Sequence, residues 1–135
     1  MTARAWWYAA GALYAAGLVV LLSWPEPIDG LDGVSPVVQH FLAWCAATPA
    51  ATWITYPVLE QVTNVLVFVP AGLVARRLIR LPSAALLAIG VAISLSAELV
   101  QAALLPHRFA TASDVIANSL GFAIGVICTK YLPRR

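Results

Sequence analysis

The chain has 135 residues, a formal net charge of +2, 61% hydrophobic residues and only 10% charged ones. Soluble domains usually contain about 25% charged and about 45–50% apolar residues. This composition excludes a soluble globular domain, and we predict an all-α integral membrane protein whose residues 1–135 form a single membrane domain.

Residues 6–24 form a continuous apolar run with Trp6 and Trp7 at its start and Trp24 at its end. The run is longer than the apolar region of a usual signal peptide, and no small-residue cleavage site precedes Pro25. Aromatic residues at both ends of an apolar run are typical of the two membrane–water interfaces. We therefore predict a transmembrane helix that is retained in the mature protein.

The connection formed by residues 25–56 is predicted to be an outer loop. Its "DGLDG" stretch lacks the remaining ligand positions of a calcium loop, so a solvated turn is expected. Residues 36–47 are too short to span, and their apolar spacing predicts a short extracytoplasmic interfacial helix. The expected apolar face consists of Val37, Val38, Phe41, Leu42 and Cys45.

Three further spans are predicted at residues 57–75, 83–105 and 113–132. Each is long enough to cross roughly 30 Å of hydrocarbon at about 1.5 Å per residue. Pro57 suits the first turn of its span, and Pro70 is expected to kink the same helix, which should close at Arg76 and Arg77. Ser113 or Asp114 is expected to cap the last span. Cys45, in the outer loop, and Cys128 form no motif, so neither a disulfide, a metal site nor a cofactor is expected.

The basic residues predict the orientation in the membrane. With four spans, Arg108 lies alone on one side, and the other side collects Arg4, Arg76, Arg77, Arg80, Lys130, Arg134 and Arg135. Cytoplasmic loops carry an excess of Lys and Arg, so both termini are predicted to face the cytoplasm. These residues flank spans and form no continuous groove, so nucleic-acid binding is not expected.

Acidic and amide side chains recur at helical spacing in the outer halves of three predicted spans. They are Glu60 and Asn64, Glu98 and Gln101, and Asp114 and Asn118. Polar residues in a span normally face the bundle interior or a water-filled cavity, because a carboxylate facing lipid costs several kcal/mol. We expect one outward-facing polar pocket with Arg108 at its rim. The alternative is structural, since such side chains also hold helices together in membranes.

The stretch "GFAIG" places Gly121 and Gly125 four residues apart, on the same side of the helix as Asp114 and Asn118. Small residues at this spacing let another helix approach closely. Packing within the bundle is favoured, and a homo-oligomer through these two glycines is the alternative.

Two stretches, "EQVTNVLVFVPAGLVARR" at 60–77 and "SAELVQAALLPHRFATASDVIANSLGFAIG" at 96–125, resemble the VanZ-like family of small bacterial membrane proteins. The resemblance covers about residues 57–130. The matching positions are Asn64, Phe68, Pro70, Gly72, Glu98, Gln101, Arg108, Asp114, Asn118, Gly121 and Gly125. It implies structural roles for the proline and the three glycines. It further implies a cell-envelope role in the bacterial plasma membrane and an association with teicoplanin resistance, but no reaction.

Three functions remain open at this point. The first is non-enzymatic binding of a membrane lipid, a lipid-linked cell-wall precursor or a lipoglycopeptide, with Arg108 meeting an anionic group by bidentate hydrogen bonding. The second is a hydrolase or transferase acting on such a lipid, with Glu98 and Asp114 as acid and base, Arg108 stabilising negative charge and His107 as a possible base. No known catalytic motif supports it. The third is a small transporter, although no inverted repeat is visible.

Overall fold

The computed structural model describes residues 3–22, 36–104, 111–129 and 131. Within these ranges the chain forms only α-helices: α1 (Ala3–Leu22), α2 (Pro36–Ala47), α3 (Tyr56–Leu78), α4 (Ser83–Leu104) and α5 (Ala112–Cys128). The predicted all-α fold is confirmed. Arg108, His107, Lys130, Arg134 and Arg135 lie outside the described residues.

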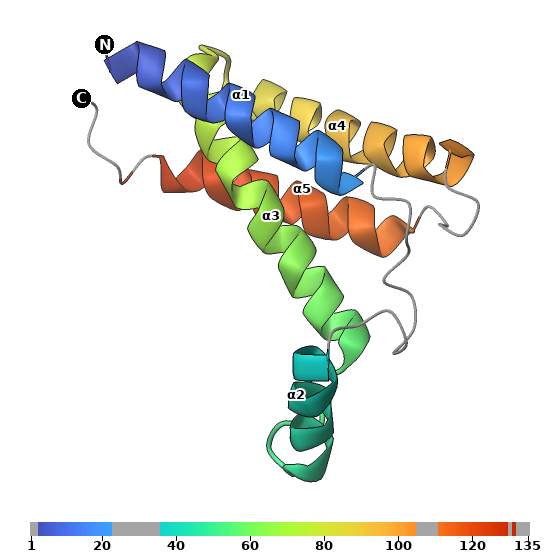
Figure 1. The fold of residues 1–135 in the computed structure, drawn as a ribbon. Helices are drawn as coiled ribbons and strands as arrows, with labels where there is room; N and C mark the ends of the chain where they lie inside the picture. The colour runs from blue at the N-terminus through green and yellow to red at the C-terminus, as the bar shows by residue number, and fades with distance from the viewer. Residues whose placement is uncertain (1–2, 23–35, 105–110, 130, 132–135) are drawn as a thin grey trace.

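Four helices form the bundle, and α3 is central to it. Figure 1 shows α1, α4 and α5 lying along roughly one axis, with α5 antiparallel to the other two, while α3 crosses them obliquely. The most extensive packing joins α3 to α5, followed by α4 to α5 and α1 to α3. The Tyr14 hydroxyl of α1 donates a hydrogen bond to the Val67 carbonyl of α3. These contacts hold α1 on the face of α3 that α5 leaves free.

Glycines make the crossing of α3 and α5 possible. A Cβ atom on Gly121 would lie 2.1 Å from the Val65 carbonyl oxygen, and one on Gly125 would lie 2.0 Å from the Val69 oxygen. From the α3 side, a Cβ on Gly72 would lie 2.0 Å from the Phe122 oxygen. Gly121 and Gly125 thus lie against α3 of the same chain, and self-association of the chain remains a prediction.

A small apolar core lies where the first half of α4 packs against the second halves of α3 and α5. Leu86, Phe122 and Val126 are buried there. The Phe122 ring fits over Gly90 of α4, because a Cβ on that glycine would lie 2.4 Å from the ring. Interlocking of this kind is the main attraction between helices in lipid, where apolar burial between helices brings little gain.

The helices begin close to the starts of the predicted segments, but α5 ends at Cys128 and not at residue 132. Two further details differ. The helix α3 does not close at Arg76 and Arg77 but includes both in its last turn, where cations interact favourably with the helix dipole. The Arg76 guanidinium donates to the Leu81 carbonyl at 2.6 Å. Neither Ser113 nor Asp114 caps α5, because the N-cap is Thr111, whose hydroxyl oxygen accepts from the Asp114 amide.

Two described helices, α3 and α4, are long and apolar enough to cross a membrane. The apolar stretch of α1 at Ala5–Val20 and the 17-residue helix α5 are shorter. Since α5 extends about 26 Å at about 1.5 Å per residue, it falls slightly short of a typical hydrocarbon thickness. The helix α3 continues through Pro70.

The helix α2 has the predicted bounds, but its apolar residues occupy two faces instead of one. Val38, Leu42 and Cys45 are wholly or partly buried, whereas Val37 and Phe41 are exposed. Cys45 therefore lies in this helix and not in a loop. The prediction missed this division because it placed all apolar residues on one face without allowing for the turn at residues 48–55 that follows α2.

Candidate functional site: a polar cluster where α3, α4 and α5 meet

Asp114, in the first turn of α5, holds two amide side chains of α3. Its Oδ1 atom accepts from Gln61 Nε2 at 2.8 Å and from Asn64 Nδ2 at 2.9 Å. Gln61 and Asn64 are three residues apart, so they lie on the same face of α3. The N-terminal end of a helix favours a negative charge, which adds to the stabilisation of an Asp114 carboxylate.

Thr111 connects this carboxylate to the acid on α4. Its hydroxyl donates to Asp114 Oδ2, and its backbone N–H donates to Glu98 Oε2 at 3.4 Å. One turn below, the Ser94 hydroxyl donates to the Val115 carbonyl of α5 at 3.3 Å. Ser94 and Glu98 are buried, with Glu98 only 5% exposed. Polar contacts therefore hold the C-terminal half of α4 against the start of α5.

Asn118 lies one turn beyond Asp114 on the same face of α5. It is 3% exposed, and its Oδ1 atom has no hydrogen-bond partner among the described residues. A buried polar atom left without a partner costs about 1–3 kcal/mol, so native structures usually supply one. This oxygen needs a hydrogen-bond donor from outside the described part of the chain.

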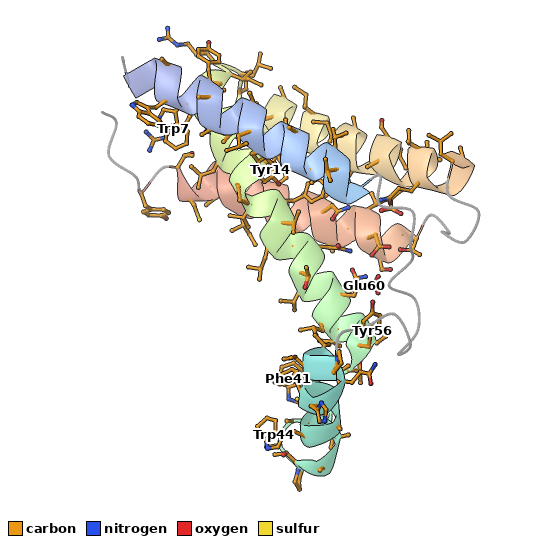
Figure 2. The ribbon with its side chains drawn as sticks, viewed as in Figure 1. Trp7, Tyr14, Phe41, Trp44, Tyr56 and Glu60 are labelled. Carbon is orange, nitrogen blue, oxygen red and sulfur yellow. The ribbon has the colours of Figure 1, made fainter. Side chains whose placement is uncertain are left out.

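We call these residues the polar cluster: Gln61, Asn64, Ser94, Glu98, Thr111, Asp114 and Asn118. The structure brings four of the predicted site residues into it, namely Asn64, Glu98, Asp114 and Asn118. Gln101 is buried on the same face of α4, near its end. Glu60 is half-buried, and Figure 2 shows it on the same side of α3 as Tyr56. The predicted rim residue, Arg108, lies outside the described residues.

Sequence reasoning missed Gln61 and Thr111. Glu60 was preferred because it pairs with Asn64 at a spacing of four, but Gln61 at a spacing of three is the residue that shares Asp114 with Asn64. The signal for Thr111 was present, because a Thr three residues before an acid at the start of an apolar run is typical of a capping box.

The chemistry of the cluster is that of a hydrogen-bond acceptor. Asp114 accepts three side-chain hydrogen bonds, from Gln61, Asn64 and Thr111, out of about four that a carboxylate can accept. Asp114 can therefore accept about one more hydrogen bond, and the Asn118 oxygen, one turn away on the same face of α5, can accept another. Hydroxyl and ammonium groups are the ligand groups that complement such a surface.

A family model described as VanZ/LLP1 matches residues 6–133. Neither the curated proteins nor the solved structures give a match to this chain. The matched range includes every residue of the polar cluster and the three glycines of the α3–α5 crossing. It also extends the resemblance to α2 and most of α1. The chain belongs to the VanZ/LLP1 family.

Proposed function

We propose that this cell-envelope membrane protein crosses the bacterial plasma membrane four times, with α1, α3, α4 and α5 as spans and both termini in the cytoplasm. The apolar lengths of α3 and α4 support the proposal, as do the apolar stretches of α1 and α5. The positive residues Arg76, Arg77 and Arg80 lie at the α3–α4 connection, which this topology places on the cytoplasmic side. The polar cluster then lies near the outer surface.

In this proposal the polar cluster binds the polar head of a membrane lipid, a lipid-linked cell-wall precursor or an amphiphile such as a lipoglycopeptide. The observation that carries it is the buried Asn118 oxygen, which has no donor among the described residues. It lies one turn from the Asp114 carboxylate, which accepts from two side chains of α3 and from Thr111. A hydroxyl or ammonium group of the head would donate to Asn118, and Arg108 would meet an anionic group. Resistance to teicoplanin would follow if such binding altered the drug's access to its target.

The second candidate, a lipid hydrolase or transferase using Glu98, Asp114 and Arg108, has less support. A general acid or base needs an oxygen that is free to reach the substrate. Both oxygens of Asp114 already accept hydrogen bonds from side chains of the cluster. This arrangement is typical of a carboxylate that positions its neighbours, and it favours binding over catalysis.

The binding proposal is tested by thermal unfolding of the purified chain in detergent, with fractions of lipid extract from the host membrane added. A ligand that binds only the folded state raises Tm. At a concentration of 100 times its Kd, it adds about 2.7 kcal/mol to the free energy of unfolding. We expect one fraction to raise the Tm of wild type and of S96A, whose side chain is exposed on α4. The same fraction should leave the Tm of N118L unchanged. Equal shifts in all three proteins would contradict binding at the cluster.

A further inference from the structure

Four apolar side chains of α2 and the turn after it are exposed together. Val37 is 77% exposed, Trp44 60% and Trp53 65%, and Phe41 is also exposed. Val37, Phe41 and Trp44 have the spacing of one helical face, and the Phe41 and Trp44 rings stack with centroids 6.3 Å apart. We call these four residues the aromatic surface. No other described helix packs extensively on α2.

The polar groups beside the aromatic surface are bonded within the segment itself. The Trp53 indole N–H donates to the Ala50 carbonyl at 3.0 Å, and the Thr48 hydroxyl donates to the Trp44 carbonyl at 2.9 Å. The His40 ring donates to the Pro36 carbonyl at 2.6 Å. The backbone N–H groups of Thr48, Ala51 and Ile54 are bonded to carbonyls three residues earlier. What the segment presents to its surroundings is therefore mainly carbon.

The segment also lacks acidic, lysine and arginine side chains, and His40 is its one histidine. No Asp, Glu, Lys or Arg occurs between Asp32 and Glu60. A partner protein could therefore not recognise this surface through ion pairs. An uncharged surface of Trp, Phe and Val matches the boundary between lipid head groups and acyl chains, where Trp is enriched.

The direction of α2 agrees with this environment. Figure 1 shows α2 at the N-terminal end of α3, running across the common axis of α1, α4 and α5. A helix that lies across the spans of a membrane bundle lies along the membrane plane. Figure 2 shows Phe41 and Trp44 on the same side of α2, the side toward which the start of α1 and the end of α5 lie. In the proposed topology that side is the membrane interior.

We propose that the aromatic surface docks into the outer leaflet at the boundary between head groups and acyl chains, and that it does so without a requirement for anionic lipid. The docking would fix the start of α3, and with it Gln61 and Asn64, at the depth of the lipid head groups. The proposal rests on the membrane placement given above, but not on ligand binding by the polar cluster.

The test is fluorescence of the full-length chain in phosphatidylcholine vesicles, with Trp44 as its only tryptophan and the other four replaced by Phe. A second protein retains only Trp53, and circular dichroism checks that both fold. Quenching is compared for lipid brominated near the carbonyl end of its acyl chains, lipid brominated near the methyl end, and aqueous acrylamide. We expect Trp44 to lose most of its emission with the first lipid, less with the second and little with acrylamide. Anionic lipid or high salt should not change this order.

Three results would overturn the proposal. Strong quenching by acrylamide with little by brominated lipid would place the surface in water. Stronger quenching by the deep bromines would place it in the hydrocarbon core. Protection from both quenchers that disappears as the protein is diluted in lipid would show that a second copy covers it. Repeating the measurement after introducing the N118L substitution into the Trp44-only protein separates the two proposals. The quenching should persist in that variant, whereas ligand binding is expected to fail.

Discussion

At the scale of single residues, Asp114 is the side chain whose replacement should affect the polar cluster most. D114L removes the shared acceptor of Gln61 and Asn64 and leaves both amides without it. Removing one partner of a buried hydrogen bond costs about 1–3 kcal/mol, so we expect a clear loss of stability. D114N keeps one acceptor oxygen and should lose less. Thermal unfolding in detergent measures both, and an unchanged Tm in D114L would contradict the shared contact.

The cap residue Thr111 gives a second prediction at this scale. T111A removes the hydroxyl that accepts from the Asp114 amide and should cost about 0.5–2 kcal/mol, whereas T111S should retain most of the stability. The matched control is T63A, because the Thr63 hydroxyl is exposed and bonds only within its own helix, to the Leu59 carbonyl at 2.9 Å. If T63A and T111A destabilise the chain equally, the capping role assigned to Thr111 is wrong.

At this scale the sequence predicted which kinds of residue lie together in the polar cluster, but it did not predict every hydrogen-bond partner. Helical spacing was sufficient to place Asn64, Glu98, Asp114 and Asn118 on facing sides of three helices. It could not choose between Glu60 and Gln61, because neighbouring positions on a helix differ by about 100° in direction and the rotation of α3 is set by its contact with α5. That rotation depends on Gly121 and Gly125, and no spacing within α3 reveals it.

At the scale of helices, the α3–α5 crossing depends on the absence of side chains. In G121A or G125A the new methyl group would lie about 2 Å from a carbonyl oxygen of α3, so the helices must separate. Overpacking costs about 1–3 kcal/mol and occasionally more, and backbone atoms have no other place to move, so we expect the upper end of that range.

The control for these variants is G17A in α1, because among the described residues no atom apart from the neighbouring backbone of α1 lies within 4 Å of a Cβ at that position. Ala is favoured over Gly inside a helix by about 0.5–1 kcal/mol, so G17A should be neutral or stabilising. Unfolding temperatures of the three variants, measured side by side, test the crossing. A G121A protein as stable as G17A would show that the two helices do not approach as closely as described.

At the scale of the whole molecule, the four-span topology can be tested with reporter fusions. In the proposed topology the C-terminus and the α3–α4 connection lie in the cytoplasm and the turn after α2 lies outside. A fluorescent protein fused after Arg135 or after Leu81 should fluoresce, and a phosphatase that is active only outside the cytoplasm should work when inserted at Ala50. The opposite result at Arg135 alone would mean that α5 does not span.

Native mass spectrometry of the protein, extracted gently from its host membrane, tests whether the polar cluster binds the head of a membrane amphiphile. Wild type and S96A should retain the same bound molecule, and N118L should lose it while unfolding at the temperature of ligand-free wild type. The fragmentation of that molecule would identify its chemical class. If N118L retains the same molecule in the same amount, or if wild type retains none, the cluster only holds three helices together and is not a binding site.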